Sequence, residues 1–139
     1  MRISWQRLVW IENHKLPGHS QVNNQDVVRV QFNQNVLAAA IDGMCEPLAV
    51  ARGDIDRVCC HPGGVKVIDA IEAALRFNQG ELNLEREVLR DYGNMSSPTV
   101  MFVLDRLLKQ GLPDKVMMTA FGPGFTCAGL LLEAQREAA

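Results

Sequence analysis

The segment that most restricts how this chain can fold is the apolar run at residues 100–104, within a stretch that has the signals of one helix. Pro98 suits the first turn of that helix, and Ser96 or Ser97 can cap it. Five successive apolar residues put apolar side chains on every side of a helix, so every side must be covered. Because one sheet covers only one side, we expect a layered fold with this helix in the middle. Its N-terminus then carries Asn94 into the interior, beside the positive end of the helix dipole.

The rest of the chain alternates between strand-like and helix-like segments. Between them lie loops and turns rich in Gly, Pro and Asn. This order predicts an α/β fold with a mixed sheet. The expected elements are a surface loop at 12–26, a strand at 27–32, a helix reaching about residue 51, a turn at 52–54, a strand at 55–60, helices at 65–77 and 84–92, and strands at 115–121 and 125–134.

Charge and hydropathy argue against several classes of partner. The 139-residue chain has a formal net charge of −2 and scattered Lys and Arg residues, so no basic surface attracts nucleic acid. Its longest apolar runs are too short to span a bilayer, and its first residues lack the long apolar core of a secretion signal. We therefore expect a cytoplasmic protein with no nucleic-acid partner and no membrane partner.

The four cysteines do not follow a metal-binding or disulfide pattern. Cys59 and Cys60 are adjacent in a strand, so their side chains should point to opposite faces, which opposes joint metal ligation. No Cys-x-x-Cys or His-x-x-x-His pair is present. The expected state is a set of reduced thiols and no bound metal.

His61 and Asn94 are the candidate catalytic residues. His61 ends a predicted strand and precedes Pro62, Gly63 and Gly64, while Asn94 follows a Tyr-Gly turn. Taken singly, each has an ordinary structural explanation, as a strand-end residue and as a turn residue. Together, an imidazole and a carboxamide can donate N–H groups to an oxygen that becomes negative, as in an oxyanion hole. A histidine can also hold a cysteine as thiolate, and these functions combine in acyl transfer to cysteine followed by carbon–carbon bond formation through an enolate.

Three motifs at residues 61–75, 88–105 and 120–126 resemble the C-terminal half of the type III polyketide synthases, the chalcone and stilbene synthase family. They occur in order along a single domain, 1–139, in which 27–139 match the family and 1–26 match poorly. The sequences His-Pro-Gly-Gly and Gly-Asn-Met-Ser-Ser favour this family over the class III ketoacyl carrier-protein synthases of fatty-acid synthesis, which remain the alternative.

The resemblance implies a fold and a reaction. The fold is the C-terminal half of a thiolase-like fold, a mixed β-sheet with a buried central helix and covering helices. In the reaction an acyl-CoA starter loads onto cysteine, and malonyl-CoA is decarboxylated and condensed with it; no cofactor is needed beyond these CoA thioesters. His61 matches the histidine that sustains the thiolate and, with Asn94, stabilises the enolate oxygen. Gly122, Pro123 and Gly124 match the loop that shapes the cyclisation cavity.

The chain departs from the family pattern in its nucleophile, because none of its cysteines matches the nucleophile motif. We therefore expect a domain that is inactive alone and has an N-terminal nucleophile-bearing half as its partner. A non-catalytic assembly half-domain, forming a dimer or a larger homo-oligomer through exposed apolar surface, is a second interpretation. A third is a hydrolase using Cys45, His61 and Asn94, although Cys45 lacks the glutamine-containing context of papain-like nucleophiles.

Overall fold

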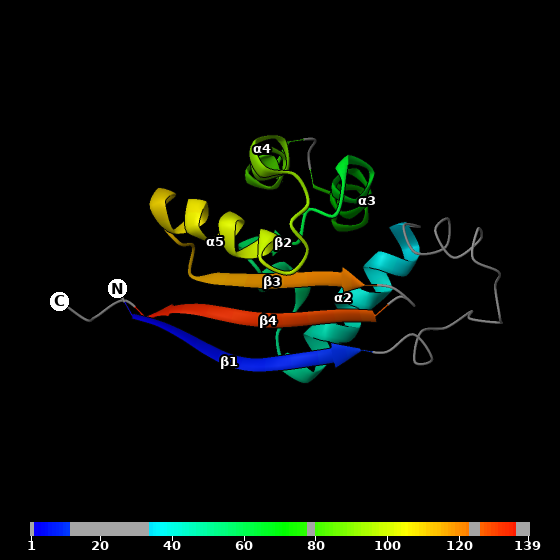
Figure 1. Ribbon diagram of the computed structural model, residues 1–139. Coiled ribbons are helices and arrows are strands. Elements are labelled where there is room, and N and C mark those ends of the chain that lie inside the picture. The colour runs from blue at the N-terminus through cyan, green and yellow to red at the C-terminus, as the bar shows by residue number, and fades with distance from the viewer. Residues whose placement is uncertain (1, 12–33, 78–79, 123–125, 136–139) are drawn as a thin grey trace.

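A four-stranded mixed sheet in the order β1-β4-β3-β2 forms the centre of the computed structural model (Figure 1), which describes residues 2–11, 34–77, 80–122 and 126–135. β4 is antiparallel to both of its neighbours, and β2 is parallel to β3. The elements are β1 Arg2–Ile11, α2 Gln34–Leu48, the 3-10 turn η2 Arg52–Asp54, β2 Arg57–Cys60, α3 Val65–Leu75, α4 Asn83–Tyr92, α5 Thr99–Gln110, β3 Lys115–Gly122 and β4 Thr126–Gln135.

These elements confirm the α/β prediction and most of the predicted segments. Helices and strands after residue 34 lie where the periodicity placed them, with ends that differ by a few residues. The expected loop at 12–26 and strand at 27–32 lie outside the described residues. β1 was not predicted; it pairs with β4 from Arg2 opposite Gln135 to Ile11 opposite Cys127, with an irregularity in the register between Trp5 and Leu8.

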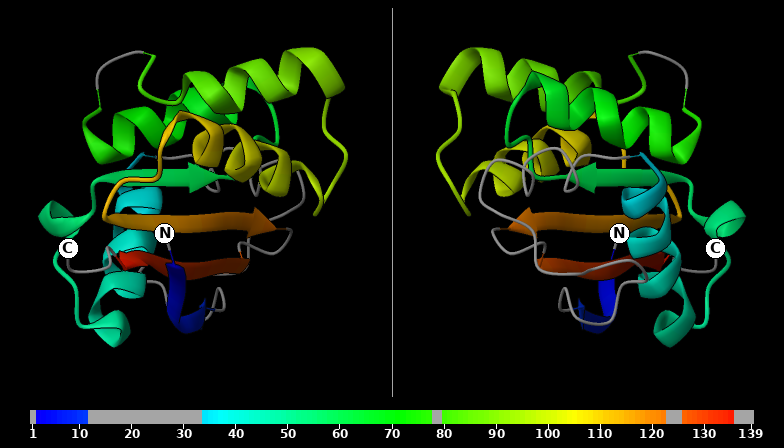
Figure 2. Two further views of the ribbon diagram at one scale, coloured as in Figure 1. Left: turned by 90° about the vertical axis from the view of Figure 1, so that its left-hand side faces the viewer. Right: turned by 90° about the vertical axis from the view of Figure 1, so that its right-hand side faces the viewer.

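Two separate apolar cores lie on the two faces of the sheet, with helices over both (Figure 2). Val58 and Cys60 point into the core under α2 and α3, whereas Cys59 points into the core under α4 and α5. The predicted divergence of Cys59 and Cys60 is therefore confirmed. Strand β2 is buried on both sides and lies at the edge of the sheet.

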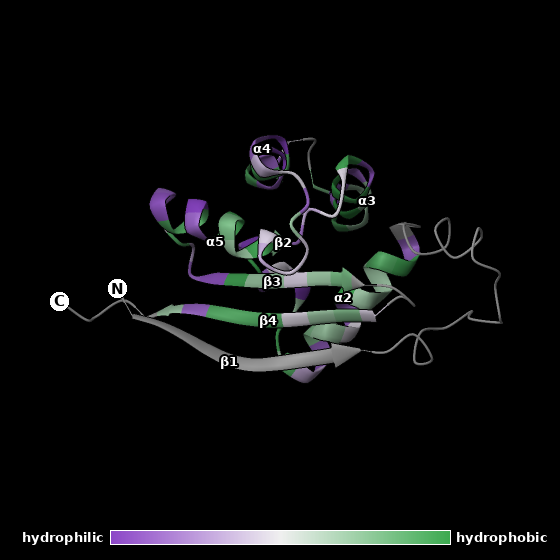
Figure 3. Ribbon diagram, viewed as in Figure 1, coloured by the Kyte–Doolittle hydropathy of each residue, from purple (hydrophilic) through white to green (hydrophobic). Residues whose placement is uncertain are grey.

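The expectation that α5 is covered on every side is wrong for the described part of the chain. Val103 and Leu107 are buried against the sheet and α4, but Met101 and Phe102 on the other side are 55% and 38% exposed. The apolar half of the helix is its N-terminal half (Figure 3). No described element lies over its outer side, so α5 presents a strip of apolar surface to solvent.

The start of α5 also differs from the capping prediction. Neither Ser96 nor Ser97 caps the helix, and Pro98 occupies the N-cap position with no side-chain cap hydrogen bond. The buried hydroxyl of Thr99 binds the preceding loop instead: it accepts from the Met95 N–H at 2.9 Å and donates to the Ser96 carbonyl at 2.7 Å. These two bonds hold the loop before α5 in place.

Gly129 permits close packing of β4 against α2. A Cβ at this position would lie 2.5 Å from the sulfur of Met44, which is fully buried. Gly129→Ala is therefore expected to lower the free energy of unfolding by about 1–3 kcal/mol, as overpacking does. Urea denaturation measures the loss. In a Met44→Val background, which removes the sulfur, the same substitution should cost clearly less; an equal cost would show that Met44 is not the cause.

Candidate active site

His61 directly follows the last residue of β2, at the edge of the sheet where the parallel strands β2 and β3 both end. The backbone N–H of His61 donates to the carbonyl of Thr119 at 2.9 Å, which continues the pairing with β3 by one residue. Its own carbonyl accepts the N–H of Gly63 at 3.0 Å, which closes a tight turn around Pro62. The backbone on both sides of His61 is therefore fixed.

The His61 imidazole is partly buried, and this burial lowers its pKa, so the ring is neutral at pH 7. A neutral imidazole carries one N–H donor and one acceptor nitrogen. Nδ1 is buried and has no hydrogen-bond partner among the described residues. On the other side of the ring, a Cβ at Gly63 would lie 3.9 Å from Nε2. Glycine at position 63 thus keeps the space next to Nε2 open.

Asn94 reaches the same turn from the loop between α4 and α5. Its Nδ2 donates to the Gly63 carbonyl at 3.1 Å, and its Oδ1 accepts the N–H of Ser96 at 2.9 Å. These two contacts determine which end of the amide is the donor. The second N–H of Nδ2 has no partner among the described residues and is available to an acceptor.

The position of Asn94 corrects one expectation. Asn94 is exposed, so it is not carried into the interior as the apolar helix suggested. Asn94 and His61 each approach Gly63: the Asn94 amide binds the Gly63 carbonyl, and a Cβ at Gly63 would lie 3.9 Å from the His61 ring. Two residues that are far apart in sequence therefore approach the same turn.

The predicted cyclisation loop is described only in part. Gly122 is the last residue of β3 and is paired with Thr126 of β4, which confirms a β-hairpin here. Pro123 and Gly124 lie outside the described residues. Strand β3 leads into this loop, and the carbonyl of its residue Thr119 accepts the backbone N–H of His61. The loop therefore begins a few residues after a strand position that contacts His61.

The four cysteines are free, buried and unsuited to nucleophilic attack at neutral pH. Burial raises the pKa of the Cys59 thiol to about 12 and that of the Cys127 thiol to about 11. Burial also raises the pKa of Cys45 and of Cys60. Since the thiolate is the reactive form, the hydrolase interpretation lacks an activated Cys45. No group of three or more potential metal ligands gathers among the described residues.

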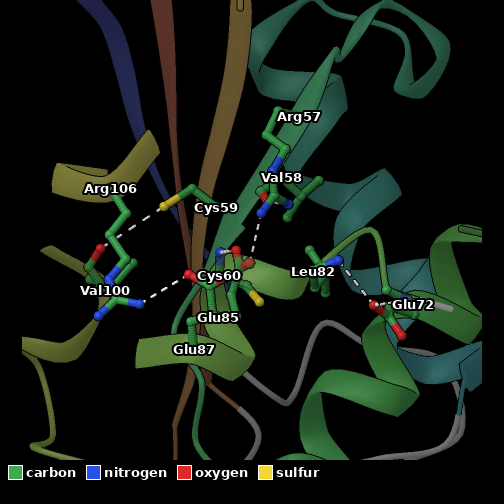
Figure 4. A network of polar contacts seen from close by, with 11 residues as sticks. Arg57, Val58, Cys59, Cys60, Glu72, Leu82, Glu85, Glu87, Val100 and Arg106 are labelled. Carbon is green, nitrogen blue, oxygen red and sulfur yellow. Dashed lines mark hydrogen bonds and ion pairs between the residues drawn. The ribbon is translucent and has the colours of Figure 1, made fainter. Parts of the chain in front are cut away.

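Two buried carboxylates were not predicted from the sequence. Glu85 on α4 is fully buried, and Glu72 on α3 is 4% exposed. Glu85 pairs with Arg57 (Figure 4), whereas Glu72 pairs with Arg86. In sequence each glutamate looks like an ordinary polar residue of an amphipathic helix. The only available signal was position, because Glu85 stands next to Leu84 and close to Val88, on the face of α4 that packs against the sheet.

Comparison with known proteins identifies the family. A sequence profile described as "Chalcone and stilbene synthases, C-terminal domain" matches residues 33–135. The chain therefore belongs to the chalcone and stilbene synthase family of type III polyketide synthases, and it contains the family's C-terminal domain. This agrees with the thiolase-like α/β fold seen here.

Two relatives show the extent of the similarity. Bisdemethoxycurcumin synthase from rice, Oryza sativa subsp. japonica, is 44% identical over 82 residues, which cover 53% of this chain and 20% of that protein. The crystal structure of PKS-I from the brown alga Ectocarpus siliculosus superposes with a TM-score of 0.62 at 34% identity, over 73% of this chain and 30% of that chain. The chain thus spans less than a third of either relative.

Proposed function

We propose that this chain is the enolate-stabilising part of an acyltransferase that condenses malonyl-CoA with an acyl-CoA starter. The observation that carries the proposal is the convergence at Gly63: the Asn94 amide is oriented by two backbone contacts, and the neutral His61 imidazole lies beside the same residue. Donors that are already oriented need no reorganisation when charge develops on a substrate oxygen.

The proposed reaction uses these donors in the decarboxylation step. The bond between the malonyl α-carbon and its carboxylate breaks, CO2 leaves, and the electron pair becomes an enolate on the thioester. N–H groups of His61 and Asn94 stabilise the enolate oxygen. The enolate carbon then attacks the acyl carbonyl on a cysteine, and the cysteine leaves as thiolate. A neutral imidazole can donate one of these hydrogen bonds, and in its protonated form it can pair with the thiolate.

The nucleophilic cysteine is proposed to belong to an N-terminal half that packs on α5. Met101 and Phe102 form an exposed apolar strip, and Tyr92 extends it, with its ring centroid 4.9 Å from that of Phe102. Arg106 lies over the Tyr92 ring at 5.7 Å. Apolar surface of this kind on the helix that follows Asn94 would place a partner next to the candidate site.

The remaining parts of the proposal concern substrates and surroundings. CoA thioesters serve as the only substrates and no resident cofactor is required. Gly122, Pro123 and Gly124 form part of the wall around the growing chain. The complete enzyme is a cytoplasmic homodimer. None of the described helices is long and apolar enough to cross a membrane.

The test compares this chain alone with the chain joined behind a nucleophile-bearing N-terminal half from the same family. The 139-residue chain alone is expected to release no CO2 from malonyl-CoA, whereas the joined protein should decarboxylate and condense. A joined protein carrying His61→Gln is the control and should lose most of this activity. Turnover by the chain alone, or full activity with His61→Gln, would overturn the proposal. Light scattering on the chain alone tests association through the exposed strip of α5.

A further inference from the structure

The outer edge of β2 is closed by an ion pair instead of by another strand. Among the described strands only β3 pairs with β2, on one side, so the Cys60 N–H and the Val58 carbonyl face away from the sheet. Oε1 of Glu85 accepts the Cys60 N–H at 3.2 Å, and the Arg57 guanidinium donates to the Val58 carbonyl through Nη1. The acidic side chain thus satisfies the backbone donor, and the basic side chain satisfies the backbone acceptor, that a neighbouring strand would have satisfied (Figure 4).

The two side chains also bind each other. Nη2 of Arg57 lies 2.6 Å from Oε2 of Glu85, and the two side chains are 14% and 0% exposed. The Glu85 carboxylate therefore serves two donors at once, one from Arg57 and one from the backbone. Burying a charge is costly unless it is paired and hydrogen-bonded, so this arrangement holds its members in one geometry.

Helix α4 connects this ion pair to the other side of His61. Glu85 lies in the first turn of α4 and binds the backbone of Cys60, the residue before His61. Asn94 lies just beyond the last turn of α4 and binds the backbone of Gly63, two residues after His61. A single rigid helix therefore holds the chain on both sides of the imidazole.

We propose that Glu85, together with Arg57, is a positioning residue that sets the place of the His61 imidazole relative to Asn94. Its importance for catalysis rests on the proposed function, but the positioning itself does not depend on turnover. Glu85 acts through the Cys60 backbone, and no described contact joins it to the His61 ring.

Glu72 provides a matched control for Glu85. It is also a buried glutamate that pairs with an arginine, with Oε2 at 2.7 Å from Nη2 of Arg86, and its Oε1 accepts the N–H groups of Gly80 and Leu82 at 3.1 and 2.9 Å. It differs in what it holds, because these groups belong to the connection between α3 and α4 and not to the His61 turn. Loss of either charge should lower the melting temperature, but only loss of the Glu85 charge should change the titration of His61.

The experiment titrates the His61 imidazole by NMR in the 139-residue chain, with the ring signals assigned by their loss in His61→Gln. Glu85→Gln sets an amide NH2 group against one of the two donors that the carboxylate serves. It is expected to move the His61 pKa up toward its ordinary value and to speed hydrogen exchange of the Cys60 amide by about tenfold. Glu72→Gln should leave both quantities at their wild-type values.

A second variant keeps the test decisive if Glu85→Gln folds poorly. Arg57→Met combined with Glu85→Leu removes both charges and fills their volume, so the fold should persist while the Cys60 N–H loses its acceptor. Unchanged His61 titration in the folded double variant overturns the inference, as does an equal shift in Glu72→Gln. Failure of both Glu85 variants to fold also overturns it, because Glu85 would then determine the fold and not the position of His61. If the joined wild-type protein does not condense malonyl-CoA although the His61 titration still depends on Glu85, the proposed function fails and the positioning by Glu85 stands.

Discussion

Replacing Asn94 with alanine is expected to slow malonyl-CoA decarboxylation by about 10²- to 10³-fold in the enzyme joined to its nucleophile-bearing half. The reason is the loss of an oriented N–H donor at the place where the enolate charge develops. The effect should fall on kcat more than on KM, because the donor acts mainly when the charge forms. Steady-state release of CO2 measures it.

Two further variants separate the lost donor from a loosened loop. Asn94→Asp keeps an acceptor for the Ser96 N–H but turns a carboxylate toward the Gly63 carbonyl and toward the enolate, so it should be at least as damaging. Ser97→Ala changes an exposed side chain of the same loop and should retain activity close to wild type. Activity within a few fold of wild type in Asn94→Ala would remove Asn94 from the proposed mechanism.

Replacing Arg57 with methionine is expected to cost about 3–5 kcal/mol of unfolding free energy at pH 7, because it leaves the fully buried Glu85 without its counter-charge. Urea denaturation measures this loss. Arg106→Met is the control, since its partners Glu87 and Asp91 are 42% and 34% exposed, and its ion pairs are therefore screened by water. It should destabilise the fold far less.

The cost of Arg57→Met should shrink as the pH falls. Burial raises the pKa of Glu85 in the folded state, while Arg57 opposes this rise, so the substitution should raise that pKa further. Between the ordinary carboxyl pKa and the raised one, the folded state holds a proton that the unfolded state has lost. Stability therefore decreases as the pH rises through the folded-state pKa, and it is regained below it. The lowered pKa of His61 acts in the opposite direction, so the two proteins are compared in a His61→Gln background, where this contribution is absent. A cost independent of pH would contradict this explanation.

Local sequence signals predicted much of the fold, and the failures have physical reasons. The alternation of side chains along a strand predicted that Cys59 and Cys60 point to opposite faces, and they enter different cores. β1 was missed because its pairing with β4 joins segments distant in sequence, and no local pattern encodes such a pairing. The apolar residues of α5 predicted complete burial, but periodicity cannot say whether the covering surface lies within the same chain.

The candidate site was predictable by residue type but not by geometry. His61 and Asn94 were predicted as candidates from their motifs, and in the structure both approach Gly63. The exposure of Asn94 was not predicted, because it depends on which elements lie over the start of α5. Glu85 was not predicted, because a buried carboxylate can be recognised only from its partners. Here the partners are a backbone N–H and an arginine, both from strand β2, which is distant in sequence.

The pairing of β1 with β4 has a consequence for how the protein is made. Arg2 aligns with Gln135, so the ribosome releases β1 long before the strand that will hold it. The helices can form from neighbouring residues in the meantime, but this edge of the sheet must wait. Until then β1 carries unpaired backbone groups that other chains can bind. Nascent copies held apart by a chaperone should therefore reach the native state in better yield than copies that emerge close together.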